Sequence, residues 1–260
     1  ALPLLSTNGG KCSPCHATKL LRIPHQPAKA LRMTDFPFAL IGFDLDGTLI
    51  DTSEDLRLAC NVALELGGIA PLAPDQIRSA IGGGARRMLE RGIEFNGSGP
   101  VSPDLFEAMF DAFLEHYQAH IDVHSPPFPG VLEMMDALDA LGVKMAIVTN
   151  KREAMADQLF RELGLRHRFA AFLGGDTLGP DKAKPAPDLL HEMIARAATP
   201  GPAAFVGDSH FDIDAAKAAG LPSVAVSFGF LMQPVETLGA DAVIDQFDEL
   251  IDALRRLPSA

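Results

Sequence analysis

The sequence has 260 residues, of which 47% are hydrophobic and 22% charged, an ordinary balance for a globular protein. This length suits one large domain or two smaller ones. The net charge of −12 argues against nucleic acid or an anionic membrane as a partner, because both recruit basic surfaces. We therefore expect a monomer or homodimer that binds a small molecule.

The first 32 residues differ from the rest of the chain, because they hold five basic residues and no acidic one. They lack the long apolar core of a secretory signal or a membrane span. We expect a disordered basic tail over residues 1–32, with the folded part opening at Met33. An organellar transit peptide is the alternative.

The cysteines are too few for a disulfide framework, so a reducing cytoplasm is the default location. Cys60 falls on an expected helix, where a cysteine usually packs as a small apolar side chain. Cys12, Cys15 and His16 have the spacing of a c-type haem attachment site, but the surrounding tail offers nothing to enclose a porphyrin. We interpret this spacing as a coincidence and keep a non-catalytic metal- or haem-binding module as the alternative.

The folded part opens on an apolar run at residues 38–43, which predicts a buried strand that ends in two carboxylates and a glycine. Thr52 or Ser53 can cap the helix that follows. Apolar spacing predicts helices over 53–66, 74–81, 86–91 and 103–121. No convincing strand falls between them, so residues 53–125 predict a helical domain inserted after the first strand.

The proline-rich stretch 125–130 marks a boundary, and beyond it helices alternate with strands. The expected helices cover 131–141, 152–163, 187–198, 213–219 and 247–257, and the expected strands cover 143–148, 170–174, 203–206, 223–228 and 242–244. Such alternation implies right-handed crossovers and a parallel sheet covered on both faces. The predicted fold is α/β, with a doubly wound, Rossmann-like core over residues 33–52 and 126–260.

Polar side chains follow several of the expected strands at the point where each strand ends. The carboxyl ends of parallel strands meet at one edge of a sheet, so we expect these side chains to share one crevice. Singly, each has an ordinary role as a cap, a surface charge or a helix-start acid, but together they favour a site. In chain order they are Asp44, Asp46, Thr149, Asn150, Asp208 and Asp212, and Lys184 lies between them, just before a helix that begins with proline.

Four aspartates in one crevice carry more negative charge than a dry site tolerates without a cation. Hard oxygen ligands without His or Cys select Mg²⁺, which keeps several waters and leaves room for a phosphate oxygen. Lys184 and the Thr149 hydroxyl can donate to the remaining phosphate oxygens. One aspartate can attack phosphorus, and a second can protonate the leaving alcohol. These residues therefore indicate phosphoryl transfer.

The same residues resemble the motifs of the haloacid dehalogenase-like superfamily, and of its phosphatases in particular, over about residues 38–250. The run from Asp44 to Thr48 is similar to the first motif, and Thr149 to the second. Lys184, with two nearby prolines, is similar to the third. The run 207–212 is similar to the fourth.

The resemblance implies a role for each of these positions. Asp44 would be the nucleophile and a Mg²⁺ ligand, and Asp46 the general acid and base, with its backbone carbonyl as a further ligand. Asp208 would complete the metal site, and Asp212 would support it through water or hydrogen bonds. The phosphoryl group would be held by Thr149, Asn150 and Lys184.

The helical segment 53–125 resembles the mobile cap of this family, and residues 81–89 resemble the substrate-facing loop of its phosphoglycolate phosphatases. The turn at Gly83 and Gly84 offers free backbone N–H groups to an anion. Arg86 or Arg87 can pair with a carboxylate. The alternative is an exposed helix start with two solvated arginines.

We therefore expect Mg²⁺-dependent hydrolysis of a small phosphate monoester through an aspartyl-phosphate, with 2-phosphoglycolate as the expected substrate. The alternatives within the fold are a phosphatase for N-acetylmuramate 6-phosphate or another sugar phosphate, a pyrophosphatase, and a phosphomutase. These share the core motifs and differ in the cap.

Overall fold

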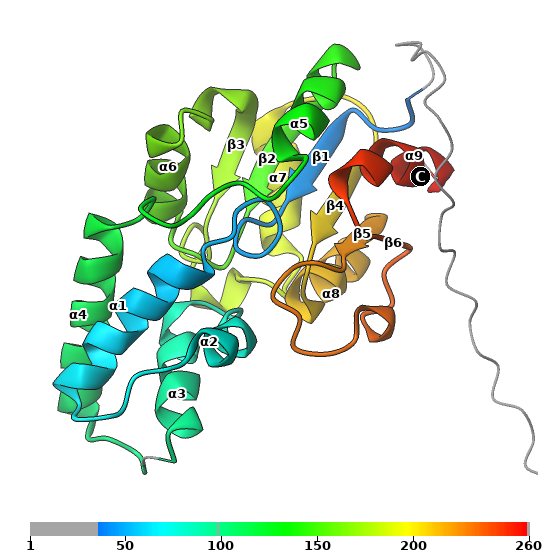
Figure 1. The fold of residues 1–260 in the computed structure, drawn as a ribbon. Coiled ribbons are helices and arrows are strands. Elements are labelled where there is room, and N and C mark those ends of the chain that lie inside the picture. The colour runs from blue at the N-terminus through cyan, green and yellow to red at the C-terminus, as the bar shows by residue number, and fades with distance from the viewer. Residues whose placement is uncertain (1–35, 98, 259–260) are drawn as a thin grey trace, which may run out of the picture.

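The computed structural model describes residues 36–97 and 99–258, and it shows an α/β core with a group of helices packed beside it (Figure 1). The expectations for the basic tail at residues 1–32, and for Cys12, Cys15 and His16 within it, lie outside the described residues. None of the described helices is long and apolar enough to cross a membrane.

The core is a six-stranded sheet with the order β3-β2-β1-β4-β5-β6, in which every neighbouring pair runs parallel. The strand β1 (Leu40–Phe43) lies in the middle, with its Phe43 opposite residues of both neighbouring strands. The chain order therefore reverses beside β1, which is where such sheets leave a crevice for a ligand. The other strands are β2 (Lys144–Val148), β3 (Phe169–Leu173), β4 (Ala203–Gly207), β5 (Ser223–Val226) and β6 (Ala242–Ile244).

Helices cover both faces of this sheet, as the alternation of strands and helices predicts. One face packs against α7 (Asp188–Ala197) and α8 (His210–Ala218). The other packs against α5 (Val131–Ala140), α6 (Glu153–Glu162) and α9 (Leu250–Arg256). Short 3₁₀ turns lie at Arg166–Arg168, Pro180–Lys182, Val235–Thr237 and Phe247–Glu249.

The side chains of β1 alternate between these two layers, as the two-residue period of a strand requires. Leu40 packs in the apolar cluster of α7 and α8, and Ile41 in the cluster on the opposite face. Gly42 lies directly against α7, since a Cβ atom there would come within 2.3 Å of the Met193 sulfur and 2.7 Å of the Phe205 ring. The central strand and α7 therefore approach more closely than any side chain at this position allows.

Four helices between β1 and β2 form the insert and stand beside the carboxyl edge of the sheet (Figure 1). The longest two, α1 and α4, pack along each other and bury a common apolar core that contains Cys60 and Phe113. We call these four the inserted helices; they are α1 (Ser53–Leu66), α2 (Pro74–Ala80), α3 (Ala85–Phe95) and α4 (Pro103–Ala119).

Some element boundaries differ from the sequence predictions. The helix α8 begins at His210 rather than three residues later, because the Asp212 carboxylate accepts a hydrogen bond from the Ser209 backbone N–H and so satisfies the helix start. Thr52 precedes α1, but its backbone is not extended and its side chain makes no capping hydrogen bond, so the predicted cap is wrong. The Thr52 hydroxyl instead donates to Asp46.

Replacing Gly42 with Ala is expected to lower the free energy of unfolding by about 1–3 kcal/mol, because the new methyl overlaps Met193 and Phe205. Urea denaturation measures this loss. Gly99→Ala is the control, since nothing lies within 4 Å of a Cβ atom there. Equal stability of the two variants would contradict the close packing of β1 on α7.

Candidate active site

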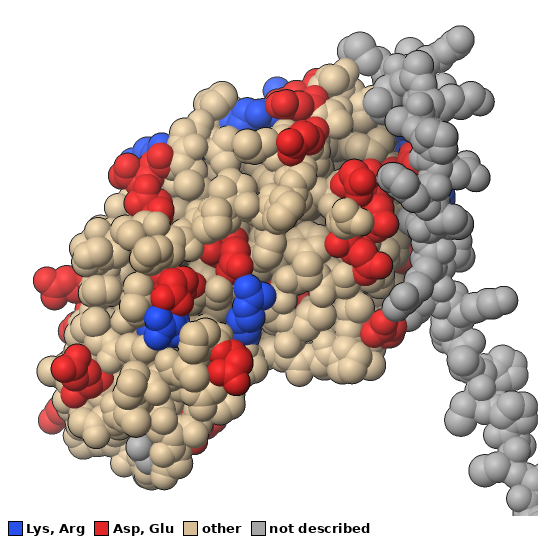
Figure 2. All heavy atoms as spheres, viewed as in Figure 1, with Lys and Arg blue, Asp and Glu red and all other residues tan. Residues whose placement is uncertain are grey.

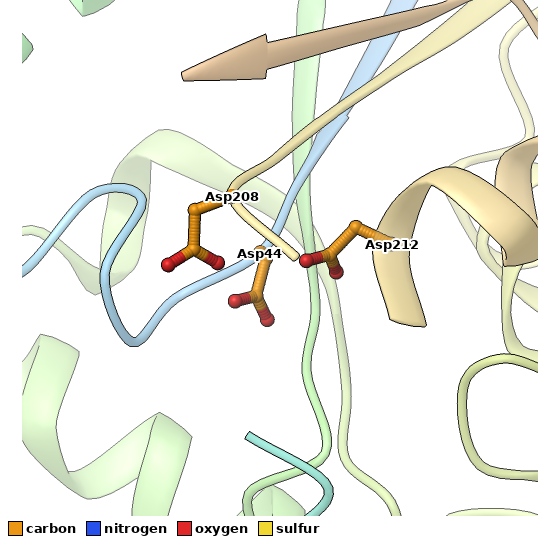
Figure 3. A group of neighbouring side chains, drawn as sticks. All are labelled: Asp44, Asp208 and Asp212. Atoms are coloured by element: carbon orange, nitrogen blue, oxygen red, sulfur yellow. The ribbon is translucent and has the colours of Figure 1, made fainter. Parts of the chain in front are cut away.

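Three carboxylates meet at the carboxyl edge of the sheet, on both sides of the point where the chain order reverses. Asp44 follows β1, Asp208 follows β4, and Asp212 lies in the first turn of α8 (Figure 3). Their ligand oxygens all lie within 4.8 Å of one another, and all three residues are buried. The structure therefore brings together three of the aspartates that the sequence places at strand ends.

A single buried lysine bridges two of these carboxylates. The ammonium of Lys184, from the loop before α7, donates to Asp44 Oδ1 at 2.7 Å and to Asp212 Oδ1 at 2.5 Å. Its third hydrogen bond goes to the carbonyl of Val148 at 2.7 Å, at the end of β2. The lysine thus ties the ends of three segments together, and all three donors of its ammonium are used.

The crevice remains short of positive charge, because one lysine faces three carboxylates. Burial raises the pKa of Asp44 to about 7; Lys184 opposes this rise and Asp212 adds to it. Burial and the neighbouring Asp212 and Asp44 also raise the pKa of Asp208 well above its usual range. A divalent cation between the carboxylates would restore the balance, and their hard oxygen atoms suit Mg²⁺.

Two glycines let the backbone approach the Asp208 carboxylate. Its Oδ2 accepts a hydrogen bond of 2.6 Å from the Phe230 N–H. A Cβ atom at Gly47 would lie 2.3 Å from that same oxygen, and one at Gly229 would lie 2.3 Å from the Asp208 Cβ. Gly47 also has φ +86°, which glycine tolerates far better than other residues. Gly47 therefore allows both the turn after β1 and the close approach of the Asp208 carboxylate.

A second buried lysine holds Asp46. The Lys151 ammonium lies 2.7 Å from both carboxylate oxygens of Asp46, and the Thr52 hydroxyl donates to one of them at 2.7 Å. Burial alone would lower the pKa of Lys151, but the charge of Asp46 raises it. Lys151 was not among the predicted site residues. Its position directly after Thr149 and Asn150, at the end of β2, is the feature of the sequence that could have indicated it.

Thr149 and Asn150 line the same crevice from the end of β2. The Thr149 hydroxyl is buried and accepts a hydrogen bond of 3.2 Å from the Lys151 backbone N–H. The Asn150 amide donates to the carbonyl of Lys184 at 3.0 Å, which fixes the lysine loop to β2. The side-chain oxygen of Asn150 is buried without a partner among the described residues.

A cavity of about 720 Å³ opens over these residues, between the core and the inserted helices. The core contributes the aspartates and lysines described above, and the inserted helices contribute a largely apolar wall. Basic and acidic side chains lie mixed on this face, around the region where the inserted helices meet the core (Figure 2). From the inserted helices and the loop before α3 the wall includes Leu56, Ile81, Met88, Phe110, Phe113, Leu114 and Tyr117.

The predicted cap residues lie on this wall or beside it. Gly83 and Gly84 line the cavity, and both have positive φ. Arg86 also lines it, but its guanidinium makes two hydrogen bonds of 2.9 Å with Glu107. Arg87 pairs with Glu90 at 2.9 Å and is not among the residues that line the cavity. Their pairing with a substrate carboxylate stays a prediction, because both arginines already hold a glutamate.

Residues 41–226 match the family model of haloacid dehalogenase-like hydrolases. The chain belongs to this family. A phosphoglycolate phosphatase of Caulobacter vibrioides is 41% identical over 216 residues, which cover 82% of this chain and 89% of that protein. A phosphoglycolate phosphatase of Chromobacterium violaceum is 37% identical over 215 residues, covering 83% of this chain and 96% of that protein.

Solved structures of the haloacid dehalogenase-like family share the fold. The crystal structure of a predicted phosphoglycolate phosphatase from Haemophilus somnus superposes with a TM-score of 0.77 at 30% identity. The match covers 83% of this chain and 97% of that one. The similarity therefore extends over both the sheet and the inserted helices, since 83% of 260 residues exceeds the core alone.

Replacing Lys184 with Met is expected to lower the free energy of unfolding by about 3–5 kcal/mol, because it leaves buried carboxylates without their cation. Urea denaturation in EDTA measures the loss. Lys182→Met is the matched control, since Lys182 pairs with Asp188 at the surface, where the loss of an ion pair is expected to leave stability nearly unchanged. Similar losses in the two variants would argue against a buried bridge.

Proposed function

We propose that this protein is a Mg²⁺-dependent phosphatase that hydrolyses 2-phosphoglycolate to glycolate and phosphate. The observation that carries the proposal is the position of Asp44, which lies in the cavity beside two more carboxylates and Lys184. The relatives named phosphoglycolate phosphatase, 37% and 41% identical, support the choice of substrate. The small number of cysteines supports the cytoplasm as its location.

Asp44 and Asp208 would hold the magnesium ion, together with the backbone carbonyl of Asp46, and Asp212 would support the site through hydrogen bonds. The fit rests on hard oxygen donors and on three buried carboxylates that share one lysine, and the raised pKa values of Asp44 and Asp208 agree with it. When bound, the ion would supply that charge, so that both carboxylates stay ionised while a phosphate group approaches.

Asp44 then attacks the phosphorus atom, and the bond between phosphorus and the glycolate oxygen breaks. Asp46 gives a proton to that leaving oxygen and later takes one from the water that hydrolyses the aspartyl-phosphate. Lys151 and Thr52 keep the Asp46 carboxylate in place between these two steps. Binding of the transferred phosphoryl group falls to Thr149, Asn150 and Lys184, which line the cavity.

The inserted helices serve as a cap over this site in the proposal. Residues 33–52 and 126–260 form the catalytic core, and residues 53–125 form the cap that closes the cavity from the opposite side. The support is the cavity wall, in which core residues that carry charge face the apolar side chains of α3 and α4. Closing such a wall over the substrate excludes water and strengthens the electrostatic interactions inside.

Replacing Asp44 with Asn is expected to lower phosphate release from 2-phosphoglycolate by at least about 10³-fold, because an amide cannot form the aspartyl-phosphate. A colorimetric phosphate assay measures the rate. Asp136→Asn is the control, since Asp136 is an exposed aspartate of α5 that pairs with Arg168. Retention of full turnover by the Asp44 variant would refute the assigned nucleophile.

Removal of divalent metal with EDTA is expected to abolish turnover, and Mg²⁺ is expected to restore it, because the carboxylates otherwise repel the phosphate. The assay uses a panel of 2-phosphoglycolate, N-acetylmuramate 6-phosphate, glucose 6-phosphate and pyrophosphate, each with and without Mg²⁺. Preference for a panel member other than 2-phosphoglycolate would correct the substrate. An isomerised sugar phosphate without phosphate release would indicate a mutase.

A further inference from the structure

Two polar groups on the cavity wall have no assigned contact with the substrate in the mechanism above. Tyr117 of α4 lines the cavity, and its hydroxyl is buried without a hydrogen-bond partner among the described residues. Lys151 also lines the cavity, where it donates to both carboxylate oxygens of Asp46 and places its charge beside the Tyr117 hydroxyl. A buried donor without an acceptor is rare in a folded protein and points to a ligand that supplies one.

These two groups lie side by side. The Lys151 ammonium is 4.6 Å from the centre of the Tyr117 ring, so the inserted helix α4 and the loop after β2 meet at this contact. Burial raises the pKa of Tyr117 to about 12, so its hydroxyl stays protonated near neutral pH and acts as a donor. Together they present a positive charge and a neutral donor, a combination suited to a carboxylate.

Their position relative to Asp46 indicates which part of the substrate they meet. In the proposed mechanism Asp46 protonates the leaving oxygen, so the alcohol part of the substrate lies on the Asp46 side of the cavity. In 2-phosphoglycolate the carboxylate is separated from that oxygen by one carbon atom. A group this close to the leaving oxygen lies within reach of Lys151, whose ammonium is 2.7 Å from the Asp46 carboxylate.

We propose that Tyr117 and Lys151 form the binding site for the carboxylate of the substrate, with the Tyr117 O–H as the donor and the Lys151 ammonium as the neighbouring positive charge. This inference rests on the proposed phosphatase function and deepens it. It defines the substrate class as phosphate esters whose alcohol carries a carboxylate on the ester carbon. It assigns the preference for substrates with this carboxylate to the contact between α4 and the core rather than to the arginines at the start of α3.

The other cations on the cavity wall are less suited to this role. Lys184 contacts Asp44 and is assigned to the phosphoryl group in the proposed mechanism. Arg86 is held by both oxygens of Glu107. Arg152 is exposed and lies 5.7 Å from the ring centre of Phe110, so it remains accessible to water. Arg152 is therefore the rival that the experiment must separate.

The test compares 2-phosphoglycolate with ethyl phosphate, which has a methyl group where the carboxylate stands. The measured quantity is the ratio of kcat/KM for the two substrates, in wild type, Tyr117→Phe, Arg86→Met and Arg152→Met. Tyr117→Phe keeps the ring beside Lys151 and removes only the hydroxyl. We expect the ratio to fall at least about tenfold in Tyr117→Phe, as for a lost hydrogen bond to a charged group, and to stay near the wild-type value in both arginine variants.

A second measurement covers the case in which the variant loses activity for structural reasons. Glycolate carries the carboxylate without the phosphate, and its dissociation constant, measured by calorimetry, is expected to be about tenfold higher for Tyr117→Phe than for wild type. Melting temperatures of the four proteins show whether each variant is folded.

The possible results separate the inference from the function on which it rests. A wild type that hydrolyses ethyl phosphate as well as 2-phosphoglycolate, or a Tyr117→Phe variant with the wild-type ratio, overturns the carboxylate site and leaves the phosphatase intact. A fall of the ratio in Arg152→Met or Arg86→Met alone moves the site to that arginine and also overturns it. A wild type that releases phosphate from neither ester overturns both proposals.

Discussion

The site depends on an imbalance of charge, in which three buried carboxylates converge on one lysine. Lys184 bridges Asp44 and Asp212, whereas within residues 36–97 and 99–258 the donor to Asp208 is a backbone N–H. Burial raises the pKa values of Asp44 and Asp208, and the neighbouring carboxylates raise them further. Such a crevice is costly as a purely structural feature, because buried charges stabilise a fold only when they are well paired. A cation and an anionic substrate together give the arrangement a physical purpose.

The topology of the sheet creates this imbalance. The strands β1 and β4 are neighbours although three helices of the core and two further strands separate them along the chain. Their carboxyl ends are therefore held side by side by backbone hydrogen bonds, which are indifferent to the charges that follow. Gly47 and Gly229 then allow the Asp208 carboxylate to sit against the turn after β1. The hydrogen bonds and packing of the sheet therefore hold these carboxylates close together despite their mutual repulsion.

The two buried lysines lie on different sides of the cavity. Lys184 lies on the side of Asp44, where the phosphoryl group is proposed to bind, and Lys151 lies on the side of Asp46, where the alcohol is proposed to leave. Only Lys151 contacts an inserted helix, through the Tyr117 ring. Because Lys151 touches both Asp46, the proposed general acid, and an inserted helix, it is well placed to link recognition of the alcohol with the proposed closure over the site.

Local patterns in the sequence were sufficient to predict the α/β fold and the polar residues that follow its strands. Apolar runs mark the buried strands, and helical periodicity marks the helices between them. Asp44, Asp208 and Lys184 were found in this way, and the structure brings them together. Only the tertiary structure shows Lys151 and Tyr117 in contact and Arg86 already held by Glu107. These pairings join residues far apart in the chain, and the packing of the inserted helices against the core and against one another sets the partners, which no local pattern encodes.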